Sequence, residues 1–345
     1  MILKAAYSTI AASSIVEVVD QDFTIGPVAS CRLFNQGSND IYELQTGDGR
    51  RYVARLSGRK PRGLANIGYE TTFLAHLDHL GIVVGVPVAG RDGELWRILD
   101  APEGAREFAI FKRLEGRTPR ANLRLTGIAD AQTLAGIRAI GATLAQIHDA
   151  GASFAGPPSL YRIDGRHLID DPLAQIVAVV DAALAQKATA IAQALAEQLA
   201  QRAPLLSIGV CHGDNHGGNA LIVDQADGRA VPGWFDFENA APGFLTYDLA
   251  TFLWAELNLS RTAVLAEARQ PLWAAFIKGY RSVRPIPEPD FDAIGLFIAI
   301  RHVWLMGLYA GSIDQMGARL VSAEWFRDGF ALVRKWDGLA APPVE

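Results

Sequence analysis

The stretch His212-Gly-Asp214-Asn-His216-Gly-Gly-Asn219, followed by Trp234-Phe-Asp236-Phe, decides how this sequence is interpreted. Asp214 and Asn219 stand five positions apart in a glycine-rich segment that predicts a loop. Apolar, strand-like runs flank the loop, and Asp236 follows the next apolar run. A chance Asp-x4-Asn pair is common, but the pair, its flanks and the third acid together form a specific pattern.

This set of polar side chains suits phosphoryl transfer. The reaction needs a group that orients and deprotonates an acceptor hydroxyl, and oxygen ligands for a Mg²⁺ ion on the donor phosphates. Asp214 is the candidate base, and Asn219 and Asp236 are the candidate Mg²⁺ ligands, so these three are the predicted catalytic residues. Turn formation is the competing explanation for Asp214, because Asp before Asn and Gly favours a turn.

The first hundred residues predict a small β-sheet with one helix. Turn signals such as Gly47-Asp-Gly49 separate short β-prone runs, and one segment has apolar residues at helical spacing. The predicted strands are 29–34, 41–46, 51–56, 95–99 and 107–114, and the predicted helix is 68–80. A further helix is predicted over 5–19 at the N-terminus.

From residue 130 onward the pattern changes to long helices. They are predicted at 131–150, 171–203 (one or two helices), 246–257, 262–283, 291–311 and 323–336. Short strands are predicted at 205–210, 220–223 and 231–235, around the glycine-rich loop. The sequence therefore predicts an α+β fold, with a mostly β nucleotide-binding lobe over 1–114 and a helical catalytic and substrate-binding lobe over 115–345.

Two features of the first lobe suit a nucleotide. The turn containing Gly37, Ser38 and Asn39 lies between two predicted strands and can offer backbone N–H groups to phosphates. Arg55 lies in a predicted strand, and Glu70 follows on the predicted helix, which is an arrangement that can hold phosphate oxygens. An ordinary hairpin and an unpaired surface arginine explain these residues equally well when they are taken alone.

Other residues near the loop are expected to have structural roles. His212 is expected to fix the shape of the loop through hydrogen bonds, and Asp248 to cap or anchor it. The tryptophans on helical faces, Trp254 and Trp304 among them, are expected in the core.

Composition narrows the possible partners. A net charge of -5 argues against a nucleic-acid or anionic-membrane binder. Cys31 and Cys211 are far apart, so neither a disulfide scaffold nor a thiolate zinc site is indicated. No apolar run approaches the roughly 20 residues of a membrane span. We therefore expect a cytoplasmic protein, and nothing in the sequence indicates its oligomeric state.

The sequence resembles the aminoglycoside phosphotransferase and choline kinase superfamily. The segment from His212 to Asn219 is similar to its catalytic loop, and the segment from Asp236 to Asp248 to its metal-binding segment and following helix. The resemblance implies a bilobal protein-kinase-like fold that uses ATP and Mg²⁺. The layout is similar to the bacterial homoserine-kinase-like and stress-response-kinase-A-like branches.

The same resemblance assigns the nucleotide site. It implies that Gly37, Ser38, Asn39, Arg55 and Glu70 serve the phosphates, and that the hinge near Arg113 and Leu114 binds adenine. Arg55 departs from the family pattern, in which better-studied relatives have Lys. Arginine keeps the charge but presents it as a planar fork, so the phosphate contact would differ in geometry.

The sequence thus predicts an ATP-dependent kinase that phosphorylates a hydroxyl of a small molecule, such as an aminoglycoside-, homoserine- or choline-like acceptor. Two alternatives stay open: a metal-dependent hydrolase using His212, Asp214, His216 and Asp236, and a non-catalytic nucleotide-binding pseudokinase. The hydrolase leaves Asn219 unexplained. The polar candidates for the acceptor wall are Glu238, Glu256, Arg301 and Asp314.

Overall fold

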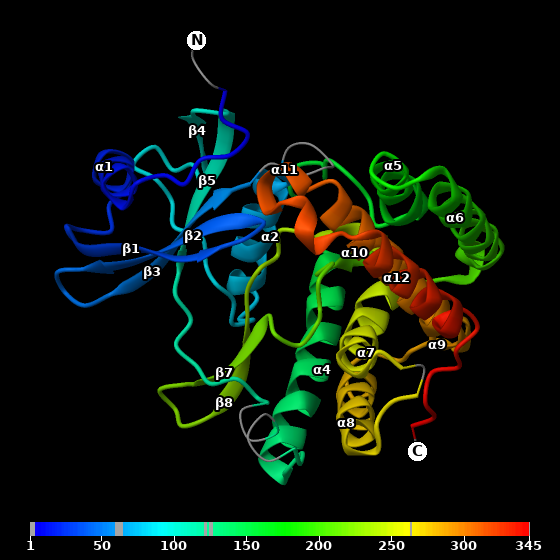
Figure 1. The fold of residues 1–345 in the computed structure, drawn as a ribbon. Helices are drawn as coiled ribbons and strands as arrows, with labels where there is room; N and C mark the ends of the chain where they lie inside the picture. Colours follow the sequence, from blue (N-terminus) through cyan, green and yellow to red (C-terminus); the bar gives the residue numbers. More distant parts are fainter. Residues whose placement is uncertain (1–3, 59–64, 121–122, 124–126, 263, 345) are drawn as a thin grey trace.

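The chain folds into two lobes, a small one built on a sheet and a larger helical one (Figure 1). The computed structural model describes residues 4–58, 65–120, 123, 127–262 and 264–344. The sheet has five antiparallel strands in the order β1-β2-β3-β5-β4. The predicted bilobal, protein-kinase-like α+β fold is confirmed. The division of the chain at residue 114 stays a prediction.

The small lobe places a helix on each side of its sheet. Helix α1 packs through Ile15 and Val19 on one face, against Tyr42 and Phe108. Helix α2 lies on the other face, toward the helical lobe (Figure 1). The strands are β1 (Val28–Gln36), β2 (Asn39–Thr46), β3 (Arg51–Ser57), β4 (Arg97–Ala101) and β5 (Gly104–Lys112), and the helices are α1 (Ala12–Asp22) and α2 (Ile67–His79).

The large lobe is built from long helices around a continuous apolar core. Helix α4 runs through its middle, and α10, which is almost entirely buried, lies beside α7 and α12 (Figure 1). These helices are α4 (Ala131–Gly151), α5 (Asp171–Val177), α6 (Ala182–Arg202), α7 (Thr246–Ser260), α8 (Gln270–Arg281), α9 (Glu288–Asp292), α10 (Ile294–Ala310), α11 (Ile313–Met316) and α12 (Ala323–Trp336). A π-helical turn at Arg166–Asp170 precedes α5.

Two small antiparallel ladders hold the glycine-rich loop between the lobes. Strand β6 (Ile208–Cys211) pairs with β9 (Ala241–Phe244), and β7 (Ala220–Asp224) pairs with β8 (Ala230–Trp234). The loop leaves β6 and enters β7, while the segment containing Asp236 joins β8 to β9. Pairing of these four strands therefore brings the loop and Asp236 together.

Several predicted boundaries differ from the observed ones. The N-terminal helix begins at Ala12 instead of residue 5. The single helix expected over 262–283 begins only at Gln270, with Pro271 in its first turn, where a missing N–H is tolerated. Residues 291–311 divide between α9 and α10. Strand β9 was missed because it contains Pro242 and Gly243, both of which disfavour a strand by composition.

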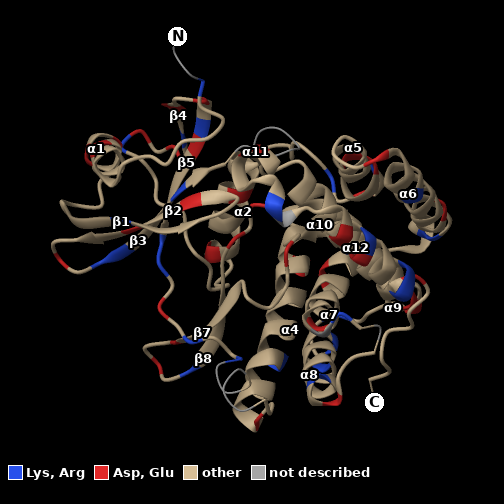
Figure 2. Cartoon of the chain, viewed as in Figure 1, with Lys and Arg blue, Asp and Glu red and all other residues tan. Residues whose placement is uncertain are grey.

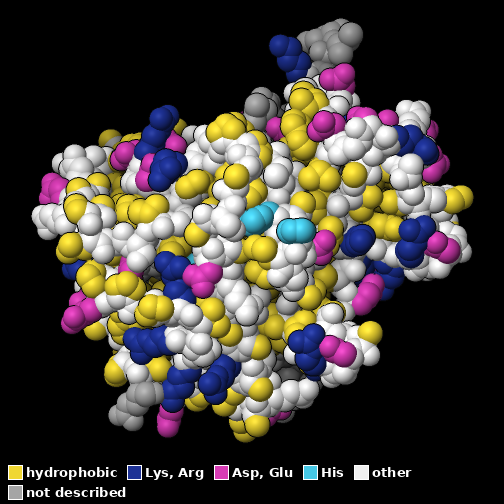
Figure 3. All heavy atoms as spheres, turned by 180° about the vertical axis from the view of Figure 1, so that it is seen from behind, with side chains coloured by type: hydrophobic (Ala, Val, Ile, Leu, Met, Phe, Trp, Pro, Cys, Tyr) yellow, Lys and Arg dark blue, Asp and Glu magenta, His cyan; other side chains and the backbone are white. Residues whose placement is uncertain are grey.

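Charged side chains of both signs are spread over both lobes (Figure 2). On the face shown in Figure 3, basic and acidic side chains lie interspersed among apolar ones. Among the described residues, no helix combines the length and apolar character that a membrane crossing requires.

Helices α4 and α8 approach each other closely at two glycines. A Cβ atom on Gly141 would lie 2.0 Å from the carbonyl oxygen of Phe276, and one on Gly279 would lie 1.9 Å from that of Arg138. Both obstacles are backbone atoms, which cannot move aside as a side chain could. The two helices can therefore pack at this distance only with glycine at both positions.

We predict that Gly141→Ala lowers the free energy of unfolding by about 1–3 kcal/mol, because overpacking forces the helices apart. Gly165→Ala is the control, since its Cβ would meet only Leu199 at an ordinary 3.7 Å. Urea unfolding of both variants measures the difference. Equal stability of Gly141→Ala and the control would contradict the packing argument.

Candidate functional site

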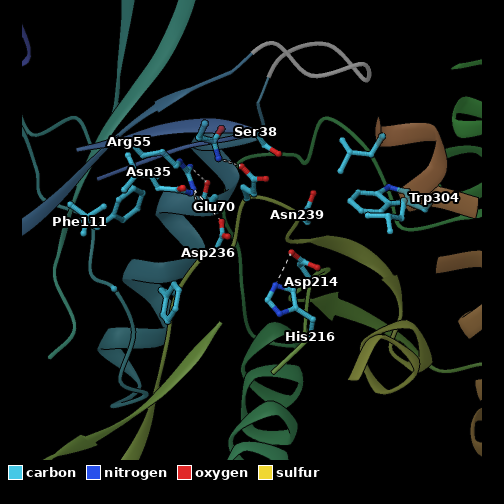
Figure 4. Close-up of a pocket in the computed structure, with 18 of the residues that line it drawn as sticks. Asn35, Ser38, Arg55, Glu70, Phe111, Asp214, His216, Asp236, Asn239 and Trp304 are labelled. Carbon is cyan, nitrogen blue, oxygen red and sulfur yellow. Dashed lines mark hydrogen bonds and ion pairs between the residues drawn. The ribbon is translucent and has the colours of Figure 1, made fainter. Parts of the chain in front are cut away.

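A cavity of about 1120 Å³ lies between the lobes and collects the predicted site residues (Figure 4). Ser38, Asn39, Arg55, Glu70, Arg113, Leu114, Asp214 and Asp236 line it. Gly37 lies at the turn of the β1–β2 hairpin, where its carbonyl oxygen accepts a hydrogen bond from Gln315 of α11. Asn219 is buried and donates its side-chain Nδ2–H to the backbone oxygen of Asp214 at 3.0 Å, which leaves Oδ1 for a ligand. The cavity thus brings together eight of the predicted site residues, while Gly37 and Asn219 are not part of its lining.

The buried carboxylate of Asp248 fixes the backbone of the glycine-rich loop. Asp248 accepts hydrogen bonds from the backbone N–H groups of His212 at 2.7 Å and Gly213 at 2.9 Å. Its third bond is to Nε2 of His148 at 3.0 Å. Burial alone would raise the pKa of Asp248, but the bond to His148 and the other donors outweigh it and lower the pKa. The structural role predicted for Asp248 agrees with these contacts.

His212 shapes the loop from within. Its Nδ1 lies 3.2 Å from the amide nitrogen of Asp214, and its Nε2 lies 3.2 Å from the carbonyl oxygen of Phe235. Burial lowers the pKa of His212, so the neutral ring accepts at Nδ1 and donates at Nε2. Both nitrogens are engaged, so His212 cannot bind the metal of the alternative hydrolase site.

Arg55 and Glu70 form the ion pair that the sequence suggested. Nη1 of Arg55 donates to Oε1 of Glu70 at 2.8 Å, and Nη2 donates to Oε2, so the pair is bidentate. Both side chains are buried, and Nη1 of Arg55 also lies 4.0 Å from Oδ1 of Asp236. The pair therefore joins β3 to α2 and places a fixed cation beside Asp236.

Asp236 occupies a strained and crowded position. Its φ angle is +65°, a conformation that non-glycine residues rarely adopt. Burial in the cleft, followed by the charge of Glu238, raises the pKa of Asp236 to about 7, although Arg55 acts in the opposite direction. The carboxylates of Asp236 and Glu238 are hard oxygen donors of the kind that a divalent cation prefers.

Asp214 is held by a residue from α10. Its Oδ1 accepts a hydrogen bond from Nη2 of Arg301, and its Oδ2 lies 3.7 Å from Nε2 of His216. The sequence offered Arg301 only as a candidate for the acceptor wall. Its contact with Asp214 was missed because 87 residues separate the two and no spacing pattern connects them.

The acceptor wall differs from the expected one. Glu238 and Arg301 line the cavity, but Glu256 does not: it is fully buried against Arg120 and Arg269. Asp314 is exposed outside the cavity lining. The side chains that the sequence missed come from α10 and from the segment around α5. They are His167, Asp171, Gln175, Trp304, Leu305 and Leu308, and Trp254 of α7 also lines the cavity.

Comparisons with known proteins relate the sequence to a family of enzymes. A model of the phosphotransferase enzyme family matches residues 30–286. A Deinococcus radiodurans protein described as uncharacterized is 34% identical over 335 residues, covering 96% of this chain and 92% of that protein. A homoserine kinase of Cupriavidus taiwanensis is 29% identical, with 78% and 76% of the two chains covered.

Solved structures share the fold. An amicoumacin kinase in complex with AMP-PNP and Ca²⁺ superposes with a TM-score of 0.73 at 18% identity, covering 97% of this chain and 96% of that one. A microcompartment-associated aminopropanol kinase gives a TM-score of 0.68 at 21% identity, with 95% and 99% covered. With the family model matching more than half of its length, this chain belongs to the phosphotransferase enzyme family and is a kinase.

Proposed function

We propose that this kinase transfers the γ-phosphoryl group of MgATP to a hydroxyl group of a small molecule, with Asp214 as the base. The observation that carries the proposal is the meeting of three distant segments in one cavity: the Arg55–Glu70 pair, Asp236, and the loop containing Asp214. Each segment supplies one requirement of phosphoryl transfer, namely phosphate binding, metal binding and acceptor activation.

Each residue has a defined task in the transfer. The carboxylate of Asp214 accepts the proton of the acceptor hydroxyl as its oxygen bonds to the γ-phosphorus and the bond from that phosphorus to the bridging β–γ oxygen breaks. Glu70 engages both terminal nitrogens of Arg55, so the fixed positive charge of Arg55 and its remaining N–H groups are what phosphate oxygens would meet. Ser38 and Asn39 of the β1–β2 turn line the same cavity, whereas the N–H of Gly37 donates to the carbonyl oxygen of Asn39 at 3.0 Å.

The metal would be held by Asn219 and Asp236. Oδ1 of Asn219 is the amide atom left for a ligand, and Asp236 lies in the carboxylate-rich part of the cleft. When bound there, Mg²⁺ supplies positive charge to the phosphate oxygens. Arg55 stays beside Asp236 and keeps one cationic group in the cleft.

The acceptor is proposed to lie against α10. Trp304, Leu305 and Leu308 give this wall an apolar surface, while Asp171 and Gln175 supply polar groups opposite. Matched proteins named for homoserine, aminopropanol and amicoumacin support a small hydroxyl-bearing acceptor. The hinge at Arg113 and Leu114 borders the other end of the cavity and is proposed to receive adenine.

A thermal-shift titration with ATP, in Mg²⁺ and in EDTA, tests the nucleotide site. Ligand at 100 times its dissociation constant stabilises a fold by about 2.7 kcal/mol, so the melting temperature should rise measurably with MgATP. Asp236→Ala should lose the Mg²⁺-dependent part of this rise. A wild-type protein that melts identically with and without MgATP would refute the proposal.

Asp214→Asn tests the base. The variant should retain nucleotide affinity but lose about 100-fold or more in kcat, because the amide cannot accept the hydroxyl proton. Asp227→Asn is the control, since Asp227 pairs with Arg229 on the surface away from the cavity. Turnover within twofold of wild type in Asp214→Asn would remove this residue from the role.

Asp236→Asn tests the electrostatic cost of ionising Asp236 beside Glu238. The pKa of Asp236 is raised from 3.8 to about 7, so between pH 4 and pH 7 the folded chain keeps a proton that the unfolded chain has lost. Folding stability therefore falls as pH rises through this window. Melting temperatures in EDTA should show a gain for the variant over wild type that grows from pH 5 to pH 7 and then levels off. A gain that does not depend on pH would contradict the assignment.

A further inference from the structure

Arg301 enters the site from α10, a helix whose buried side chains are mostly apolar. Its guanidinium is 3% exposed and has three polar partners: Asp214 Oδ1, the hydroxyl of Tyr247 at 2.9 Å and the carbonyl oxygen of Gly213 at 3.4 Å. Two indole rings flank it, with the guanidinium carbon 4.3 Å from the ring centre of Trp304 and 5.1 Å from that of Trp254. The cation is thus fixed from several directions.

We propose that Arg301 is a positioning residue for phosphoryl transfer, which holds the carboxylate of Asp214 in one orientation toward the acceptor. The inference rests on the proposed function of Asp214. Arg301 acts through Asp214 and through the helix that carries it, and takes no part in proton transfer itself.

Stability alone does not account for a charged residue at this place. A buried ion pair loses much of its Coulombic gain to desolvation, and well-packed apolar residues of similar volume often stabilise a core as well or better. Fourteen residues of α10 are buried, and most of them are apolar. An apolar residue at position 301 could therefore pack as well in this helix. We infer that the arginine is there because it contacts the carboxylate of Asp214.

The Arg55–Glu70 and Arg301–Asp214 pairs differ in the way that this role requires. Arg55 engages both oxygens of Glu70, so that carboxylate is fully occupied and serves only to hold the arginine. Arg301 engages only Oδ1 of Asp214. Oδ2 lies 3.7 Å from Nε2 of His216, and none of the described residues donates a hydrogen bond to it. Rotation of the carboxylate is restrained while one oxygen stays available for the acceptor proton.

Arg301 also connects the base to the acceptor wall. Trp304, Leu305 and Leu308 follow it at spacings of three, four and seven residues, so all four side chains lie on one face of α10. The wall and the group that orients the base are therefore parts of one rigid helix. If the acceptor moves along this wall, the distance between its hydroxyl and Asp214 changes, because α10 holds Asp214 in place through Arg301.

Variants at three positions test the proposal. Arg301→Met removes the charge but keeps a side chain of similar length. Arg301→Lys keeps the charge without the planar guanidinium group. Tyr247→Phe removes only the hydroxyl that accepts a hydrogen bond from Arg301. The matched control is Arg106→Lys, because Arg106 is equally buried and pairs with Asp40 on the far side of the sheet. MgATP turnover is measured with water, homoserine and 1-amino-2-propanol as acceptors, and affinity with AMP-PNP and Mg²⁺.

Arg301→Met should lower kcat by about 100-fold or more while the AMP-PNP dissociation constant stays within about twofold of wild type. Arg301→Lys should recover part of the loss, and Tyr247→Phe should lose about 3- to 10-fold through the loosened arginine. Arg106→Lys should lower the melting temperature without changing kcat. A purely structural Arg301 would instead lower stability and leave kcat per folded molecule unchanged.

Two results would overturn the inference. If folded Arg301→Lys and Tyr247→Phe both keep wild-type kcat, Arg301 has no positioning role although the kinase assignment stands; these two variants decide the matter should Arg301→Met fail to fold. If wild type binds AMP-PNP but turns over ATP with none of the three acceptors, the proposed function and the inference fail together.

Discussion

The arrangement of the site depends on the buried carboxylate of Asp248. Its two oxygens accept the backbone N–H groups of His212 and Gly213 and contact the imidazole of His148, and none of these groups reaches solvent. Asp248 lies on α7 and His148 lies on α4. Nδ1 of His148 is in turn hydrogen-bonded to the hydroxyl of Tyr280 on α8 at 2.8 Å. One side chain thus ties the loop to three helices, so the position of Asp214 is set by the core of the large lobe.

A second constraint links the metal segment to the nucleotide lobe. Phe237, next to Asp236, packs with its ring centre 6.0 Å from that of Phe73 on α2 and 4.3 Å from that of His212. Helix α2 also carries Glu70, which fixes Arg55. Displacing α2 would therefore disturb Arg55, the proposed phosphate-binding residue, together with Asp236, the proposed metal ligand. The apolar core crosses from one lobe to the other at this point, and the alignment of the two halves of the site follows from it.

The sequence was informative where function requires a fixed local spacing. Asp214, Asn219 and Asp236 could be found because a loop and a following strand impose their separation, and Asp248 because a helix start near the loop suggests an anchor. Glu256 was misassigned because a glutamate on a helix is usually exposed, whereas here Arg120 and Arg269 neutralise it inside the core. The Arg301–Asp214 contact depends on how α10 packs against α7, and no local sequence pattern predicts this packing. Trp254 and Trp304 are core residues, as expected, and they also line the cavity.

The unfavourable features of the structure are concentrated around Asp236. Its left-handed backbone conformation, its raised pKa and the neighbouring Glu238 each cost folding free energy. None of them improves packing, and the fold tolerates them because Phe237 beside it is held by Phe73 and His212. A cation bound to Asp236 would neutralise the carboxylate charges that help to raise this pKa, and its binding would therefore offset part of this cost.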